Sequence, residues 1–320
     1  MQVLLAGWAW LPIDELGTVL QDDLERSLTK TPKVPHEYEP EDGVEPVQAF
    51  VRQGNFLGVP RQFFFERAQI QHQINDERSD GLLIPQDKCV FLGSVSGHPR
   101  WDEQTKALEV TKLAYVERKV GAIVQAAPAW GKTAFAIRLL CAIGRKTFIG
   151  VHKEFLAEQW KSRIEKMAPY LKVGIWQGEK EEIEDRDVVI GLIQTLSNRD
   201  VSKEVSDQFG MCIWDEVHRV GARTWSTVPP KFNARFHLGL SARPKRIDGM
   251  DDIIRWLVGP VIYKAQYVTP VPRIHRIWSP YRRPKWIVQV EDGEGEALTY
   301  STHLKALASS KTRNIRIVDE

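Results

Sequence analysis

Residues 126–133 of the chain have the sequence AAPAWGKT, and the fold is organised around them. The apolar run before them, residues 120–124, predicts a buried strand, and residues 134–143 after them predict a helix. A strand, a loop of small residues ending in Gly-Lys-Thr, and a helix form the context of a phosphate-binding loop. Unpaired backbone N–H groups and the helix dipole favour negative charge at the start of such a helix.

The last two residues of this stretch carry the chemistry of the motif. Lys132 is predicted to reach the β- and γ-phosphates of a nucleotide, and Thr133 to place its hydroxyl on Mg²⁺. The pattern departs from G-x-x-x-x-G-K-[ST] at its first place, which holds Ala126 instead of glycine. A chance Gly-Lys-Thr between a strand and a helix is the alternative interpretation, and the rest of the chain decides between the two.

The composition describes a globular protein whose 320 residues leave room for two domains. Charged residues make up 27% and the net charge is only +2, so any nucleic-acid surface must be a local patch. No apolar run approaches the roughly 20 residues of a membrane span, so no membrane partner is expected. The three cysteines lack metal-like spacing and two lie in apolar segments, which indicates buried thiols in a reducing compartment.

Strand-like and helix-like segments alternate from residue 120 onward. Further strands are predicted at residues 147–151, 173–176, 188–192, 211–214 and 236–240, with a helix at 155–167 and an acidic loop at 178–187. This alternation predicts an α/β fold with a mainly parallel sheet covered by helices. A phosphate-binding loop after its first strand places the ligand at the carboxyl edge of the sheet.

A second motif, IWDEVH at residues 213–218, ends a predicted strand in two adjacent carboxylates. Asp215 is placed to hold Mg²⁺, directly or through water, and Glu216 to orient or deprotonate an attacking water. Alone, this is an ordinary acidic pair at the end of a strand. Because it follows Lys132 on a later strand of the same sheet, the two motifs together predict a nucleotide hydrolase.

Residues 215–218 resemble motif II, the DExH form, of the superfamily 2 helicases. Arg100 and Gln104 resemble the R-x-x-x-Q arrangement upstream of the phosphate loop in that family. Residues 151–160 resemble its motif Ia, residues 191–196 the motif before the DExH box, and residues 240–246 its motif III. The resemblance covers residues 99–320 and is greatest to phage- and repair-type members similar to the XPB-like DNA translocases.

The resemblance implies a RecA-like fold, the cofactors ATP and Mg²⁺, and a set of site residues. Gln104, beside Arg100, is expected to read the adenine, and the nucleotide-binding set also includes Ala129, Trp130, Gly131 and Ala134. Coupling of hydrolysis to movement is expected of His218, Ser241, Ala242 and Arg243. Contact with the nucleic-acid backbone is implied, on equal terms with structural packing, for His152, Lys153, Gln194 and Thr195.

Three residues depart from the family pattern. Ala129 replaces a usual glycine, and if the loop needs positive φ there, its side chain costs about 1–2 kcal/mol. Trp130 stands where the family has a small residue, and it is expected either to pack over the loop or to stack on a partner domain. Arg243 replaces the threonine of motif III, where it is either a phosphate contact or an exposed charge.

Three regions are predicted along the chain. Residues 1–95 form a smaller accessory domain, 96–268 the first RecA-like domain, and 269–320 a linker with the beginning of an incomplete second RecA-like domain. The Q-x-x-G-R-x-x-R segment that brings an arginine finger is not among these residues, so the second half is expected in cis or in trans. In the accessory domain, residues 63–65 are three phenylalanines, which either form a core or contact nucleic acid.

The predicted function is a nucleic-acid-dependent ATPase, a DNA helicase or translocase, weakly active as the isolated chain. DNA is favoured over RNA as the partner, and a bacterial or phage-infected host cytoplasm as the location, both by resemblance. Two alternatives remain open. One is the translocating subunit of a restriction-type complex, and the other is a non-catalytic module that binds ATP or nucleic acid.

Overall fold

The computed structural model describes residues 1–34, 44–67, 73–93, 99–118, 121–266 and 308–309, without the side chains of residues 99–100 and 117–118. The chain divides into two compact units, Met1–Thr269 and Pro270–Glu320. Of residues 269–320, predicted as a linker and the beginning of a second RecA-like domain, all except 308–309 lie outside the described residues. Within them, no helix has the length and apolar character to cross a bilayer.

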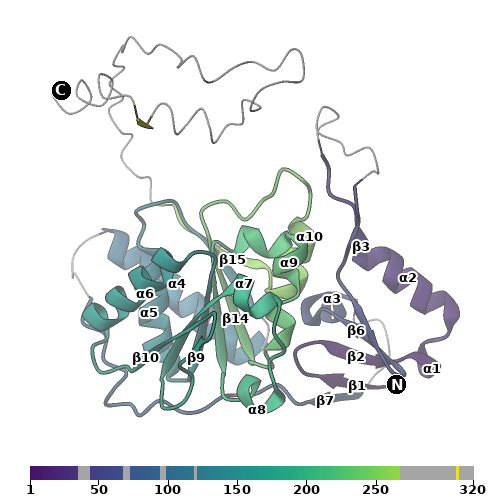
Figure 1. Ribbon diagram of the computed structural model, residues 1–320, viewed down its shortest axis with the longest axis horizontal. Helices are drawn as coiled ribbons and strands as arrows, with labels where there is room; N and C mark the ends of the chain where they lie inside the picture. Colours follow the sequence, from purple (N-terminus) through teal and green to yellow (C-terminus); the bar gives the residue numbers. More distant parts are fainter. Residues whose placement is uncertain (35–43, 68–72, 94–98, 119–120, 267–307, 310–320) are drawn as a thin grey trace, which may run out of the picture. The chain divides into compact units, whose positions relative to one another are not determined.

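A mainly parallel eight-stranded sheet forms the larger part of the first unit (Figure 1). Its strands follow the order β11-β10-β12-β9-β13-β14-β8-β15, and every pairing except β10 with β11 is parallel. This confirms the predicted α/β fold. The strands are β8 (Ala122–Gln125), β9 (Thr147–Val151), β10 (Val173–Gln177), β11 (Lys180–Glu181), β12 (Val188–Leu192), β13 (Met211–Asp215), β14 (Phe236–Ser241) and β15 (Val261–Lys264).

The antiparallel edge strand β11 lies inside the segment predicted as an acidic loop. Gly178 has a φ of 53°, in the left-handed region that glycine enters without steric cost. The chain can therefore reverse directly after β10 and pair back on it, Gln177 opposite Lys180. Charge alone suggested a loop, because the hairpin depends on one backbone angle and not on apolar alternation.

Helices cover both faces of the sheet because its strands are apolar on both sides. In β13, Met211 and Ile213 belong to one hydrophobic cluster, and Cys212 and Trp214 to the other. The first face carries α4 (Pro99–Leu113), α5 (Lys132–Ile143) and α6 (Glu154–Met167), with the π-helix η2 (Ala114–Arg118) after α4. Associated with the second face are α7 (Ile193–Ser197), α8 (Lys203–Ser206), α9 (Arg223–Ser226), α10 (Asp251–Leu257) and the 3₁₀ helices η3 (Val217–Gly221) and η4 (Pro229–Lys231).

The N-terminal residues form a separate five-stranded sheet of order β5-β6-β2-β1-β7, in which only β1 and β7 pair in parallel. Strands β3 and β4 form a separate two-stranded sheet, and along the chain they come between β2 and β5. The elements are β1 (Gln2–Leu5), β2 (Ala9–Pro12), α1 (Ile13–Leu16), α2 (Thr18–Leu28), β3 (Thr29–Lys30), β4 (Val47–Gln48), β5 (Val51–Gln53), β6 (Phe56–Val59), α3 (Arg61–Glu66) and β7 (Gln73–Asp76).

The three phenylalanines of α3 pack in a core. Phe63 and Phe64 are buried, and Phe65 is half-buried against the same hydrophobic cluster. The ring of Phe63 meets that of Trp256 in α10 edge-on, with centroids 5.2 Å apart. Of the two expectations for these residues, core packing is the one that the contacts support.

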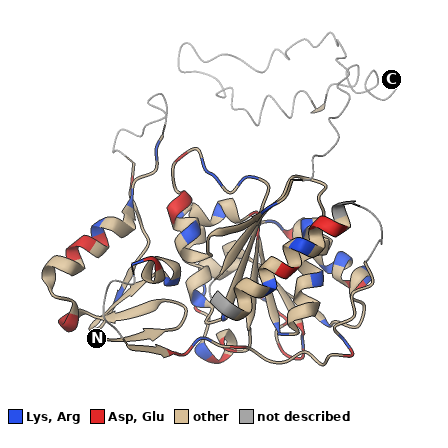
Figure 2. Cartoon of the chain, turned by 180° about the vertical axis from the view of Figure 1, so that it is seen from behind, with Lys and Arg blue, Asp and Glu red and all other residues tan. Residues whose placement is uncertain are grey.

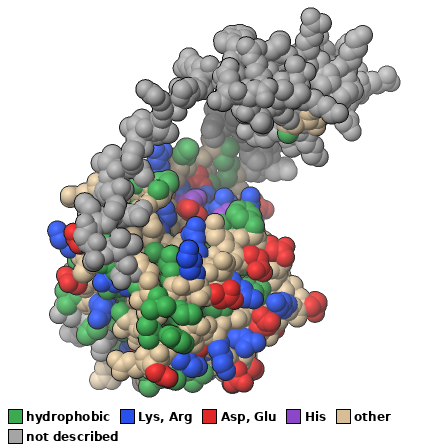
Figure 3. All heavy atoms as spheres, turned by 90° about the vertical axis from the view of Figure 1, so that its left-hand side faces the viewer, with side chains coloured by type: hydrophobic (Ala, Val, Ile, Leu, Met, Phe, Trp, Pro, Cys, Tyr) green, Lys and Arg blue, Asp and Glu red, His purple; other side chains and the backbone are tan. Residues whose placement is uncertain are grey.

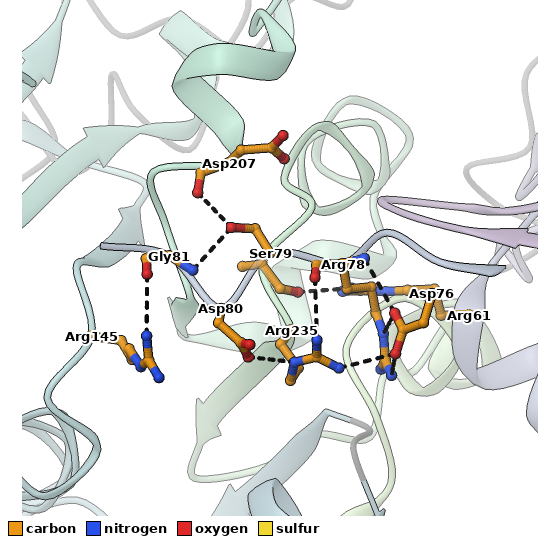
Figure 4. A network of polar contacts seen from close by, with 10 residues as sticks. Arg61, Asp76, Arg78, Ser79, Asp80, Gly81, Arg145, Asp207 and Arg235 are labelled. Atoms are coloured by element: carbon orange, nitrogen blue, oxygen red, sulfur yellow. Dashed lines mark hydrogen bonds and ion pairs between the residues drawn. The ribbon is translucent and has the colours of Figure 1, made fainter. Parts of the chain in front are cut away.

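Polar contacts of the segment after β7 join the N-terminal residues to the parallel sheet (Figure 4). Arg235, just before β14, donates from Nε to Asp80 Oδ1 at 2.5 Å and from Nη1 to Asp76 Oδ2 at 3.0 Å. Arg78 donates from Nε to Asp76 Oδ1 at 2.9 Å. Burial alone would raise the pKa of Asp76, but these two guanidinium groups hold it well below its ordinary value.

Candidate nucleotide site

The loop between β8 and α5 has the backbone of a phosphate-binding loop. Gly131 has a φ of 94° and Ala129 a φ of 65°. Because Ala129 has a side chain, this left-handed conformation costs it about 1–2 kcal/mol. Trp130, between them, is fully buried, with its ring 5.5 Å from that of Phe135 in α5. Its Nε1 donates to Glu103 Oε2 at 2.6 Å. Of the two expectations for Trp130, the contacts support packing with the loop.

Gln104 of α4 holds this loop from the buried side. Its Nε2 donates to the carbonyl of Trp130 at 2.6 Å, and a Cβ on Gly131 would lie 2.7 Å from the same nitrogen. Gln104 is 3% exposed and is not among the residues that line the cleft described next, and within the described ranges its Oε1 has no partner. Its adenine-reading role stays a prediction, and the side chain of Arg100 lies outside the described residues.

A cleft of about 490 Å³ opens beside the loop at the carboxyl edge of the sheet. It brings together the predicted phosphate-loop residues, from β8–α5, and the predicted acidic pair, from the end of β13. Figure 3 shows histidine, acidic and basic side chains gathered at one end of the face in view. The cleft is lined by Ala129, Gly131, Lys132, Thr133, Ala134, His152, Phe155, Leu156, Gln159, Arg163, Met167, Asp215 and Glu216.

The two carboxylates differ in their environments. Asp215 accepts from Trp160 Nε1 at 2.9 Å and from the backbone N–H of Glu216 at 3.0 Å, and burial raises its pKa. Glu216 has a φ of 50°, a strained value for a non-glycine residue. The hydrogen bond of His218, whose Nδ1 lies 3.4 Å from Glu216 Oε2, is the main cause of the lowered pKa of Glu216. Glu216 is therefore held ionised beside the cleft.

This donor set suits a Mg²⁺–nucleotide complex. The Thr133 hydroxyl and the Asp215 carboxylate line one cleft, and Mg²⁺ prefers one or two protein oxygens together with phosphates and water. The part of the chain that the structure describes contains no cluster of three or more His, Cys, Asp or Glu that could hold a metal alone. Lys132 is beside the same groups, with its Nζ donating to the carbonyl of Ala126 at 3.1 Å.

The residues predicted to couple hydrolysis to movement meet at the ends of neighbouring strands. His218 Nδ1 lies 3.2 Å from Ser241 Oγ, and Ser241 Oγ accepts from the backbone N–H of Arg243 at 3.2 Å. The carbonyl of Ala242 accepts from Gln125 Nε2 at 3.3 Å, and the side chain of Arg243 is exposed. A chain of contacts thus runs from Glu216 through His218 to Ser241, and the coupling role itself stays a prediction.

The four residues predicted to face nucleic acid lie after the neighbouring strands β9 and β12. Gln194 Nε2 donates to the carbonyl of His152 at 3.0 Å, and Thr195 Oγ1 accepts from the backbone N–H of Gly178 at 3.1 Å. Lys153 and Gln194 are exposed, whereas His152 lines the nucleotide cleft. Burial, with the charges of Arg219 and Lys153, lowers the pKa of His152, so this group is neutral near pH 7.

Two residues of α6 that were not predicted donate hydrogen bonds to predicted site residues. Trp160 donates to Asp215, and Arg163 Nη1 donates to Thr133 Oγ1 at 2.7 Å. In the sequence Trp160 has the spacing of a core residue on the apolar face of a helix. The available signal was the indole N–H, which usually finds a partner when the ring is buried.

The chain is similar to known proteins over part of its length. Residues 99–246 match the family described as "Type III restriction enzyme, res subunit". The chain is 31% identical over 216 residues to "Putative ATP-dependent RNA helicase L396" of Acanthamoeba polyphaga mimivirus, covering 67% of this chain and 39% of the relative. It is 31% identical over 206 residues to "DNA 3'-5' translocase XPB2" of Sulfurisphaera tokodaii, covering 64% and 42%. The chain thus spans about two fifths of the length of these relatives.

The fold also matches a solved structure over more of the chain than the family match covers. The UvsW helicase from bacteriophage T4 superposes with a TM-score of 0.54 at 17% identity, over 82% of this chain and 99% of that one. At this identity the likeness speaks for the fold alone. It confirms the predicted RecA-like architecture.

Proposed function

We propose, since residues 99–246 form a helicase-family domain of superfamily 2, that this protein uses ATP hydrolysis to move along or remodel nucleic acid. One observation carries the proposal. Lys132 and Thr133 from the β8–α5 loop, and Asp215 and Glu216 from the end of β13, line the same cleft. A cation, a hydroxyl and two carboxylates in that arrangement are the groups that phosphoryl transfer to water requires.

Each residue then has a definable task. Lys132 moves from the carbonyl of Ala126 to the terminal phosphates, where its charge-assisted contact is stronger than a neutral one. Thr133 and Asp215 would hold Mg²⁺, which supplies charge neutralisation at the phosphates when it is bound. Glu216, ionised and fixed by His218, orients the attacking water and accepts its proton.

The N-terminal residues are proposed as an accessory domain before a first RecA-like domain, with boundaries near 95 and 268. A second RecA-like half, in cis or in trans, is proposed to complete the cleft. The proposal rests on the family and on the share of the relatives' length that this chain spans. A restriction-type duplex translocase is the alternative within the same enzyme class, and a strand-displacement assay distinguishes it from a helicase.

DNA is proposed as the preferred nucleic acid, with contacts mainly to the backbone. The loop after β14 exposes Arg243 and Lys245, while Arg246 is held by donating from Nη1 to the carbonyl of His218 at 2.8 Å. Charges of both signs are interspersed along the helices (Figure 2), so basic contacts must be local. Because one relative is named as an RNA helicase, RNA is the competing substrate to test.

ATP turnover is expected to rise when duplex DNA is added, and the DNA affinity to fall linearly with salt on logarithmic axes, because phosphate contacts release counterions. The measurement is ATPase rate against DNA, and against RNA of equal length, at several salt concentrations. Lys132→Ala serves as the control, since it should lose turnover with either polymer. If neither DNA nor RNA changes the ATP turnover, the protein is better described as a non-catalytic module or as one that acts independently of nucleic acid.

Gln104→Ala is expected to narrow the preference for ATP over GTP. A side-chain amide pairs with the N6 and N7 edge of adenine, and the buried Oε1 of Gln104 has no partner among the residues that the structure describes. The measurement is the affinity of wild type and variant for both nucleotides. A wild type without a preference, or an unchanged preference in the variant, would leave Gln104 with only its contact to the Trp130 carbonyl.

A further inference from the structure

Helix α6 contacts the carboxylate on which the proposed function places Mg²⁺. Trp160 is buried at 1% exposure, and its Nε1 donates to Asp215 Oδ2 at 2.9 Å. The other oxygen, Oδ1, accepts from the backbone N–H of Glu216 at 3.0 Å. Each carboxylate oxygen therefore has one donor and keeps a second lone-pair direction free. Two donors on opposite oxygens fix the plane in which the carboxylate meets a ligand.

Not every fully buried tryptophan has such a hydrogen bond, although Trp130 donates to Glu103 and Trp160 to Asp215. Trp176 and Trp214 are also fully buried, but in each the indole Nε1 has no partner in the described part of the chain. Burial alone has therefore not given these indoles a partner. Trp160 is the one whose N–H meets an acidic side chain at the end of β13.

The same face of α6 contacts the second predicted Mg²⁺ group. Arg163 lies one helical turn after Trp160, so the two side chains share a face. Its Nη1 donates to Thr133 Oγ1 at 2.7 Å, and Arg163 lines the nucleotide cleft. One rigid helix thus contacts two oxygen groups that come from different parts of the sheet, the β8–α5 loop and the end of β13.

We propose that α6 presets the metal-binding geometry of the site. Trp160 is a positioning residue that orients the Asp215 carboxylate, and Arg163 is a positioning residue that holds the Thr133 hydroxyl. The inference rests on the proposed function, since it needs Mg²⁺–ATP as the ligand. Donors that fix a ligand's orientation typically change metal affinity by about 10–100-fold when they are lost.

Trp160→Phe in the full chain tests the proposal, because phenylalanine keeps an aromatic ring at the buried position and removes the N–H donor together with part of the ring volume, a loss that the control variant shares. The affinity for a slowly hydrolysed ATP analogue is measured with EDTA and along a Mg²⁺ titration. We expect metal-free affinity to stay within about 2-fold, and the Mg²⁺ concentration for half-saturation to rise by roughly 10–100-fold. Trp176→Phe is the matched control, since its indole N–H has no partner, and it should leave both values unchanged.

The possible outcomes distinguish a failure of this inference from a failure of the proposed function on which it rests. If Mg²⁺ does not change the nucleotide affinity of the wild type, the proposed function is contradicted. A wild type that responds to Mg²⁺, with Trp160→Phe responding at the same concentration, would overturn the role of Trp160. Arg163→Gln, at a partly exposed position, tests the second contact even if the tryptophan variant fails to fold. It should raise the Mg²⁺ requirement alone, and an equal loss of affinity in EDTA would make Arg163 a direct phosphate contact instead.

Discussion

ATP turnover by residues 1–320 is expected to rise by roughly 10³–10⁵ when a second RecA-like half is added, because a cation from across the cleft stabilises charge developing on the γ-phosphate. In the described residues, the cleft is built from one sheet edge and α6, and the basic side chains lining it are Lys132 and Arg163. A cleft with one open wall is also wet, which weakens each electrostatic contact in it.

The measurement compares residues 1–320 alone with the same residues joined to a second RecA-like half, or mixed with a separately made one. Both are saturated with ATP and DNA, so that the rates reflect chemistry and not binding. Equal rates would mean that the activating cation lies within these 320 residues. Arg163 would then be the first residue to mutate, since it lines the cleft, and Arg243, whose side chain is exposed, the second.

Glu216→Gln is expected to lower the turnover of the completed enzyme by about 10²–10⁴, the usual contribution of a positioned general base. Glutamine keeps the shape of the side chain and removes the charge that the hydrogen bond of His218 maintains. Nucleotide affinity should change by only about 2-fold, because Lys132, Thr133 and Asp215 still line the cleft.

The check is a turnover rate and a nucleotide affinity for each variant. Glu158→Gln serves as a matched control, because Glu158 is an exposed glutamate of α6 outside the cleft lining. A Glu216→Gln enzyme with near-normal turnover would show that another group activates the water. A variant that loses nucleotide affinity as well would indicate damage to the whole site, and the rate would then carry no information about Glu216.

The order and type of the main elements followed from the sequence because their signals are local. Short apolar runs rich in β-branched residues, such as residues 147–151 and 188–192, favour buried strands, and their alternation with helices leaves few sheet topologies. The sharing of one cleft by Lys132 and Asp215 was predictable for the same reason. Both follow strands of one parallel sheet, and the carboxyl ends of such strands meet at one edge.

The directions of individual side chains could not be predicted from the sequence. Two positions were possible for Trp130 from the sequence, and in the tertiary structure it is buried and packs with the loop, where α4 supplies Glu103 as a partner for its indole. Phe63 was ambiguous until α10 brought Trp256 against it. In each case the deciding contact comes from a residue far away in the chain, which no local pattern can report.

The sequence by itself determined the α/β fold, the phosphate loop and the acidic pair. The signal for each strand, helix or motif lies in consecutive residues. Only the tertiary structure decided how that site is held. Gln104 reaches the Trp130 carbonyl from α4, and Trp160 and Arg163 reach Asp215 and Thr133 from α6. These contacts depend on how helices pack on the sheet, and packing fixes the direction of a side chain only after the chain has folded.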